Sequence, residues 1–243
     1  MMNRRELTLG LSMLAVSACT STMQPARQKQ NPPSPNAQAT PVAVSTPIRK
    51  AYIIHGFGAS PGAHWFPWLA NRLQGAGVSV DVPAMPNSLA PDFGRWQQTL
   101  EKHVGTPSAQ DIFIAHSLGT ISLLHFLSAQ KPARIGGVIL VSGFGERLPK
   151  LPAIQGYDID AYVDQARLDI AAIQAMTSNI FCVISQNDAI VAPEESLKLA
   201  RQLNGTVRMV PAGGHFLESD GFRELPAAWE CAEAIIRSAS GNV

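Results

Sequence analysis

Ser117 lies in a segment that could carry a reactive hydroxyl group. An apolar run over residues 111–115 leads into the motif AHSLG and then into a second apolar stretch over 118–130. A strand, a tight turn and a helix in this order form a nucleophile elbow, which needs small residues two positions before and after the serine. Ala115 and Gly119 meet that need. The segment predicts Ser117 as a nucleophile, and the alternative is a serine that caps the helix.

A serine hydroxyl needs a base to take its proton and an acid to orient that base. Among the six histidines, His215 stands in the glycine-containing segment PAGGHF directly after an apolar run. Asp188 stands in SQNDAIVAP, also directly after an apolar run. These positions predict His215 as the base and Asp188 as the acid, with a turn histidine and a turn or capping aspartate as the alternatives.

The remaining histidines are weaker candidates for the base. His116 is adjacent to Ser117 and should point away from its hydroxyl, while His103 and His125 fall within expected helices. His55 begins the segment HGFG after the first apolar run and is expected to order that loop. An oxyanion hole takes one N–H from the residue after the nucleophile and one from a neighbouring loop, which predicts the backbone N–H groups of Leu118 and Phe57.

Six short apolar runs alternate with longer amphipathic stretches from residue 48 onward. The runs predict buried strands and the stretches predict helices; the strands cover 50–55, 78–82, 111–115, 137–141, 180–184 and 207–210, and the helices cover 61–74, 91–104, 118–130, 159–176, 193–203 and 225–237. Strands joined by crossover helices pair in parallel, with helices on both faces of the sheet. We therefore predict a doubly wound α/β fold with one six-stranded, mostly parallel sheet. Such a sheet places its reactive groups in the loops at the carboxyl ends of the strands.

Four further acids are not expected to act in catalysis. They lie on or near the expected helix 159–176 and should form its solvated face; they are Asp158, Asp160, Asp164 and Asp169. The segment 145–163, which precedes and overlaps that helix, is the one candidate for a lid over the site. Because this segment is short, we expect a fairly open cleft.

With these motifs in place, the sequence resembles the α/β-hydrolases, and within them the small serine hydrolases of the family that contains retinoblastoma-binding protein 9 and the bacterial YdeN-like proteins. The resemblance spans about residues 49–237 and rests on HGFGASPGAHWFPWL (55–69), VPAMPNS (82–88), AHSLG (115–119), SQNDAIVAP (185–193) and GGHF (213–216). The chain order Ser117, Asp188, His215 is that of the α/β-hydrolases. The family's sheet lacks two strands of the full fold, which implies that these residues follow strands three, five and six. The six strands counted above place Ser117, Asp188 and His215 after the same three strands.

The N-terminus resembles an export signal. Arg4 and Arg5 precede an apolar run over 7–18 that is too short to span a membrane as a mature helix. The run ends in VSAC (16–19), which resembles a bacterial lipobox and predicts lipidation of Cys19; an ordinary secretory signal is the alternative. The paired arginines resemble a twin-arginine signal, and Sec export stays equally open. Residues 20–47 contain six prolines and no aromatic residue, as is typical of a disordered tether.

These features divide the chain into an export signal (1–18), a lipidated cysteine with its tether (19–47) and a hydrolase domain (48–243). We expect a lipid-anchored protein of the bacterial cell envelope, on the periplasmic side of the outer membrane. The membrane contact is then expected through the lipid anchor alone.

Charge and cysteine content exclude other classes of protein. Residues 1–47 hold four of the 19 basic residues and one of the 18 acidic residues, which leaves 15 basic and 17 acidic residues in the remainder. The expected domain therefore lacks the basic surface that nucleic-acid binding requires.

Three scattered cysteines do not make a disulfide scaffold or a zinc site. We expect Cys182 and Cys231 to be small buried hydrophobic residues, with a disulfide between them left open.

The expected activity is hydrolysis of small or extended carboxylic esters, with amides left open, through an acyl-enzyme on Ser117. No metal or organic cofactor is expected, and the partner is a small-molecule ester or amide. Two alternatives stay open from the sequence. One is a catalytically silent binding or scaffold lipoprotein with the same fold, and the other is an acyltransferase that uses the same three residues.

Overall fold

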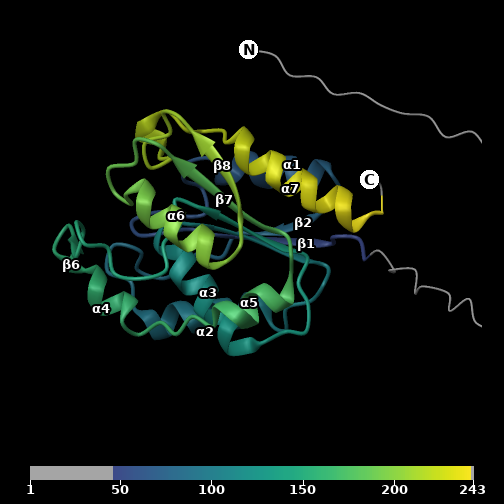
Figure 1. Ribbon diagram of the computed structural model, residues 1–243, viewed down its shortest axis with the longest axis horizontal. Coiled ribbons are helices and arrows are strands. Elements are labelled where there is room, and N and C mark those ends of the chain that lie inside the picture. Colours follow the sequence, from purple (N-terminus) through teal and green to yellow (C-terminus); the bar gives the residue numbers. More distant parts are fainter. Residues whose placement is uncertain (1–45, 242–243) are drawn as a thin grey trace, which may run out of the picture. The chain divides into compact units, whose positions relative to one another are not determined.

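The computed structural model describes residues 46–241 (Figure 1). The expected signal peptide and Cys19 lie outside the described residues, as does the expected tether except for its last two positions. Among the helices of the described part, none combines the length and the apolar character needed to cross a membrane.

Six strands form one parallel sheet in the order β2-β1-β3-β4-β7-β8. They are β1 (Lys50–Ile54), β2 (Ser79–Asp81), β3 (Asp111–His116), β4 (Gly137–Val141), β7 (Ile180–Ser185) and β8 (Thr206–Val210). β1, β3 and β4 are buried along almost their whole length because helices cover both faces of the sheet. All six expected strands are present, and the predicted fold class is confirmed.

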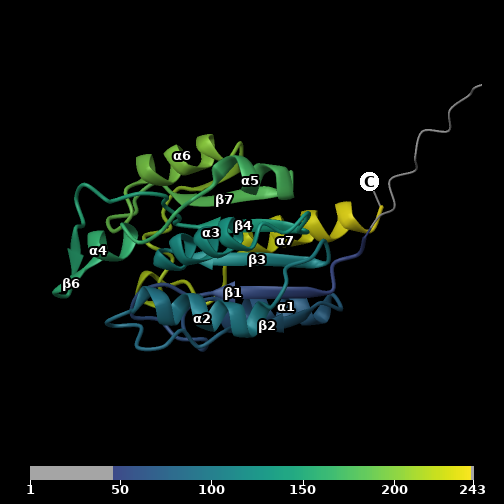
Figure 2. The same ribbon diagram turned by 90° about the horizontal axis from the view of Figure 1, so that it is seen from below.

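The helices form two layers, one on each face of the sheet (Figures 1 and 2). The helices are α1 (Phe66–Gly75), α2 (Phe93–Val104), α3 (Leu118–Gln130), α4 (Ile159–Val163), α5 (Ile170–Met176), α6 (Pro193–Gln202) and α7 (Pro226–Ala239), with a short 3-10 helix, η1 (Glu218–Asp220). α1 and α7 pack into one apolar cluster with side chains from one face of the sheet. The other helices pack into a second cluster on the opposite face. α3 is buried nearly all round, as its composition predicted.

The expected single helix over 159–176 is wrong, because two shorter helices occupy this segment. The side chain of Asp158 accepts a hydrogen bond from the N–H of Ala161 and so caps α4, while Asp169 caps α5 through the N–H of Ala172. Asp160 and Asp164 both pair with Arg147. These four acids therefore do not form one solvated helix face: two are caps, one of which also pairs with Lys131, and the other two pair with Arg147.

A two-stranded antiparallel hairpin, β5 (Ala153–Ile154) and β6 (Tyr157–Asp158), was not expected from the sequence. Gln155 and Gly156 form its turn, with φ values of 50° and 81°. Two successive positive φ values are typical of the tight hairpin turn that matches strand twist.

The first helix also differs from expectation: it begins at Phe66 and not near residue 61, and His64 before it has a φ of 54°.

The two cysteines of the described residues are free and buried. Cys182 belongs to the apolar cluster on one face of the sheet, and Cys231 belongs to the cluster on the other face. Burial raises the pKa of each thiol to about 12. Both residues are small buried hydrophobic groups, as predicted, and the disulfide that the sequence left open is not formed.

Candidate active site

Ser117 lies at the turn between β3 and α3 in a backbone conformation that few non-glycine residues adopt, with φ 54° and ψ −127°. Two glycines make room for this turn. A Cβ at Gly119 would lie 2.6 Å from the carbonyl oxygen of His55, and a Cβ at Gly56 would lie 2.9 Å from the Cβ of Ser117. The turn therefore has the tight geometry that the motif predicted, packed directly against the loop after β1.

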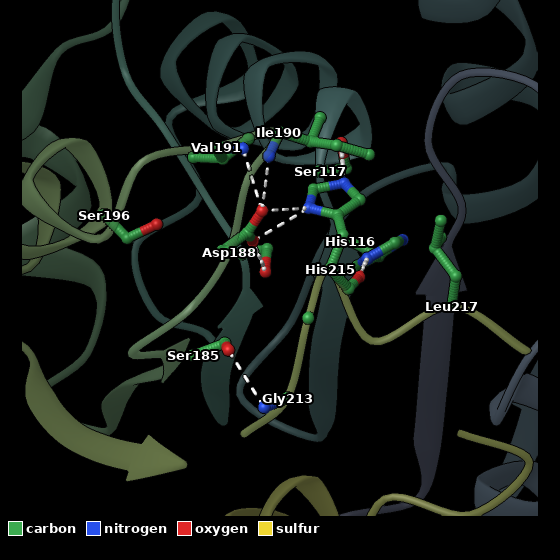
Figure 3. Close-up of polar contacts among 12 residues, drawn as sticks. His116, Ser117, Ser185, Asp188, Ile190, Val191, Ser196, Gly213, His215 and Leu217 are labelled. Carbon is green, nitrogen blue, oxygen red and sulfur yellow. Dashed lines mark hydrogen bonds and ion pairs between the residues drawn. The ribbon is translucent and has the colours of Figure 1, made fainter. Parts of the chain in front are cut away.

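Ser117, His215 and Asp188 form one continuous hydrogen-bonded chain (Figure 3). The Oγ of Ser117 lies 2.9 Å from Nε2 of His215, and Nδ1 of His215 lies 2.8 Å from Oδ2 of Asp188. The three residues come from the loops after β3, β8 and β7, so the structure brings them together across the carboxyl edge of the sheet. All three side chains are buried.

Asp188 is held as a carboxylate by several donors. Burial would raise its pKa, but hydrogen bonds from His215 and Ser142 and from the backbone outweigh this effect and lower the pKa below its ordinary value. The hydroxyl of Ser142 donates to Oδ2 at 2.6 Å, and the N–H groups of Ile190 and Val191 each donate to Oδ1 at 2.9 Å. An ionised Asp188 fixes the proton of His215 on Nδ1, which leaves Nε2 free to accept from Ser117.

The loop that presents His215 is fixed by two residues whose roles the sequence did not reveal. Oδ2 of Asp220 accepts hydrogen bonds from the N–H of His215 at 2.8 Å and from that of Leu217 at 3.1 Å. Nε2 of His116 donates to the carbonyl oxygen of His215 at 2.9 Å. His116 is fully buried, and this burial places its pKa well below the ordinary value of 6.5. His116 is therefore a neutral donor that holds the backbone of His215.

The loop after β1 lies beside the start of α3. The Cβ position at Gly56 is 3.2 Å from the backbone nitrogen of Leu118. Within the described residues, the N–H groups of Phe57 and Leu118 form no hydrogen bond with the protein. His55 orders this loop as expected: its Nδ1 bonds to the carbonyl of Gly56 at 3.0 Å, and its Nε2 accepts from the N–H of Met85 at 3.1 Å.

The segment 145–163 leaves the sheet after β4 and carries the β5–β6 hairpin. The ring of Tyr157 on this hairpin lies 5.7 Å from the ring of Phe57, measured between centroids. A cavity of about 240 Å³ separates residues 148–151 of this segment from residues 189–195 after Asp188. A larger cavity of about 660 Å³ is lined by Gly136 and Asn179, at the amino ends of β4 and β7, and so lies away from Ser117.

The part of the chain that the structure describes contains no group of three or more His, Cys, Asp or Glu side chains placed to bind a metal ion. The buried side chains of Asp188 and His215 are instead hydrogen-bonded to each other, and Ser142 also donates to Asp188. This arrangement suits proton transfer between Ser117 and His215.

Comparison with known proteins identifies relatives over most of the chain. The family model described as serine hydrolase matches residues 51–233. YdeN of Bacillus subtilis (strain 168) is 38% identical over 183 residues, which cover 75% of this chain and 93% of YdeN. The crystal structure of the ydeN gene product from B. subtilis has a TM-score of 0.71 and covers 77% of this chain and 98% of its own.

A more distant structure shares the fold alone. Est1E from Butyrivibrio proteoclasticus is 16% identical, with a TM-score of 0.55, and the match covers 81% of this chain and 88% of Est1E. The expected likeness to YdeN is confirmed, whereas the likeness to retinoblastoma-binding protein 9 stays a prediction.

Proposed function

This chain belongs to the serine hydrolase family, and from that premise we propose that it cleaves small or extended carboxylic esters through an acyl-enzyme formed on Ser117. The observation that carries the proposal is the hydrogen-bonded chain from Ser117 through His215 to Asp188, with distances of 2.9 and 2.8 Å. A chain of this kind activates a serine hydroxyl as a nucleophile.

In the proposed mechanism, Oγ of Ser117 attacks the ester carbonyl while Nε2 of His215 takes the hydroxyl proton. The ionised carboxylate of Asp188 stabilises the imidazolium that forms. The N–H groups of Phe57 and Leu118 donate to the oxyanion of the tetrahedral intermediate. His215 then gives its proton to the leaving alcohol. A water molecule, deprotonated by His215, attacks the acyl-enzyme, and His215 returns this proton to Oγ of Ser117 as the acid leaves.

Apolar side chains near the loop after β1 favour an ester with an apolar part. Leu89 is one of the few large apolar side chains exposed among the described residues, at 60% exposure, and its Cδ2 lies 3.4 Å from the Cβ position at Gly58. Phe57 and Tyr157 add two aromatic rings to the same region. Burial of apolar substrate surface against these groups would supply binding energy without a charged partner.

A fluorophosphonate probe tests the activation of Ser117 without knowledge of the natural substrate. We expect the wild-type protein to be labelled and to hydrolyse a short-chain p-nitrophenyl ester, and Ser117→Ala to lose both properties. The matched control is Ser60→Ala, because Ser60 is exposed and outside the hydrogen-bonded chain. Labelling that persists in Ser117→Ala would show that another residue is the nucleophile.

The same assay separates the alternative functions. Product transfer to an added alcohol in preference to water would identify an acyltransferase. A wild-type protein that is folded, unlabelled and inactive would favour a silent binding or scaffold protein. The bonds between Ser117, His215 and Asp188 support the active enzyme, because a scaffold has no need of a buried Ser-His-Asp chain.

We also propose that Cys19 anchors the enzyme by lipid to the periplasmic side of the outer membrane. The support is the sequence VSAC at 16–19 and Thr20 after it, where an aspartate would be the usual signal for retention in the inner membrane. Several acyl chains on one cysteine make membrane release slow. Cys19→Ser should leave an unprocessed precursor without lipid. Wild-type protein found cleaved and lipid-free in the periplasm would refute the anchor.

A further inference from the structure

Tyr157 ties the β5–β6 hairpin to a distant part of the chain. Its hydroxyl donates a hydrogen bond to the carbonyl oxygen of Pro91 at 2.6 Å, across 66 positions in the sequence. Its ring packs at the same time on the ring of Phe57, with an angle of 37° between the ring planes. Burial raises the pKa of Tyr157 to about 12, so its hydroxyl stays protonated and able to donate at neutral pH.

The hairpin holds Tyr157 in place from the other side. Ile154 pairs with Tyr157 across the two short strands, and the tight turn at Gln155 and Gly156 fixes their register. The helix α4 follows directly, and Tyr162 on it is buried, with its hydroxyl 2.7 Å from that of Ser122 on α3. The segment is therefore anchored in the core at Tyr162 and attached at its outer end by Tyr157.

Phe57 links this attachment to the reacting serine. Its ring is partly buried against the apolar cluster beneath the hairpin. Its neighbour Gly56 packs on Ser117, with a Cβ position 2.9 Å from that of the serine. Packing that fixes the Phe57 ring therefore also restricts the backbone of the loop that carries the Phe57 N–H. An oxyanion donor loses much of its effect when it is displaced from the oxygen it serves.

We infer that Tyr157 is a positioning residue: through its bond to Pro91 and its packing on Phe57, it holds the Phe57 N–H in line with the oxyanion. The inference rests on the proposed function, because it assigns a role to a residue behind the proposed oxyanion hole. It makes the β5–β6 hairpin, through Tyr157, part of the geometry that supports the proposed oxyanion hole.

The test compares Tyr157→Phe and Tyr157→Ala with the wild type, and Tyr162→Phe is the matched control. Tyr162→Phe also removes one tyrosine hydroxyl bond from this segment, but Tyr162 packs on Phe93 and Trp96. With p-nitrophenyl acetate, we expect Tyr157→Phe to lower kcat about fivefold and Tyr157→Ala to lower it about 50-fold, with KM within about twofold of wild type. Tyr162→Phe should lower the melting temperature and leave kcat near that of wild type.

Two further measurements separate positioning from general loosening of the segment. Methylboronic acid forms a tetrahedral anionic adduct with the serine, so its inhibition constant should rise in the Tyr157 variants by the same factor as kcat/KM falls. Amide hydrogen exchange over residues 56–58 should be faster in the Tyr157 variants and unchanged in Tyr162→Phe. The exchange measurement needs no enzymatic activity, so it reports on the mobility of this loop even in a variant without turnover.

The outcomes distinguish this inference from the proposed function. A wild-type protein without Ser117-dependent turnover would refute the proposed function and, with it, the role of Tyr157 in positioning an oxyanion donor. An active wild-type enzyme whose Tyr157 variants keep kcat, the inhibition constant and the exchange rate would refute the inference alone. Equal losses in Tyr162→Phe, or a loss confined to KM, would also overturn it.

Discussion

A change of pH from about 7.5 to about 5.5 should destabilise the folded protein measurably through His116. This side chain is fully buried, and its burial holds its pKa well below the ordinary value of 6.5. In the unfolded chain the same imidazole takes up a proton as the pH falls through 6.5. The unfolded state then binds a proton that the folded state excludes, so stability is complete above this pH and decreases below it.

The magnitude follows from that one proton. If the folded state excludes it throughout this range, His116 alone contributes a loss of about 1.4 kcal/mol in the free energy of unfolding between the two pH values. Burial also lowers the pKa values of His55, His64 and His125, so acid should destabilise the protein through these residues as well. A variant that differs only at residue 116 isolates the contribution of His116.

His116→Gln is that variant, because a glutamine amide can donate to the carbonyl of His215 as Nε2 of His116 does and cannot titrate. Urea unfolding at both pH values measures the difference. We expect His116→Gln to lose about 1.4 kcal/mol less than wild type on acidification and to keep most of its esterase activity. Equal losses in the two proteins would refute the assignment of His116 as a buried neutral donor. His116→Phe leaves the buried carbonyl of His215 without its donor. We expect this to lower the free energy of unfolding by about 1–3 kcal/mol at both pH values and to lower kcat.

Three further outcomes follow from the structure. Gly119→Ala places a Cβ 2.6 Å from the carbonyl oxygen of His55 and should lower the free energy of unfolding by more than about 1 kcal/mol, as measured by thermal unfolding. Gly62→Ala, with open space around it, should leave the free energy of unfolding almost unchanged. Asp188→Asn should lower kcat by about 10³-fold or more in a p-nitrophenyl ester assay, because an amide does not stabilise the imidazolium; full activity would require another acid. In a chain that begins at Thr20, thiol titration should find no fast-reacting thiol in the native state and two after denaturation, and fewer than two would indicate a disulfide between Cys182 and Cys231.

The sheet and the positions of the three candidate catalytic side chains were predictable because their signals are local. Each strand is a short apolar run that ends at a glycine, a proline or a polar residue, and each candidate catalytic side chain stands within about five positions of such an end. Ser117, Asp188 and His215 could therefore be placed on one edge of the sheet before any contact was known. Their distances from one another could not, because these depend on how the loops fold back over that edge.

The segment after β4 was mispredicted for an equally local reason. Its apolar residues continue at helical spacing through 159–176, so the pattern indicated one long helix, although Asp158 and Asp169 start two separate helices. Aspartate is common both as a helix cap and on an exposed helix face, so its identity did not decide between them. The strands of the hairpin have two residues each, which is too short for alternation to be visible.

The supporting residues of the site depend on long-range contacts that no local pattern encodes. Ser142 reaches Asp188 across 46 positions, and His116 reaches the carbonyl of His215 across 99. His116 was set aside as the base because it should point away from the hydroxyl of Ser117. The structure gives it another partner, the backbone carbonyl of His215.

The register of the sheet explains how the chain sustains a strained serine. Ile54 at the end of β1 pairs with Ala115 near the end of β3, so the loops after these two strands begin at the same level. Gly56 and Gly119 then face the neighbouring loop at distances that admit no side chain. A shift of one residue between β1 and β3 would exchange the side chains that pack into the two apolar clusters, and the resulting misfit of side-chain volumes on both buried faces opposes it. The positive φ of Ser117 is thus maintained by the packed core on both sides of the sheet, while the local sequence supplies only the space for the turn.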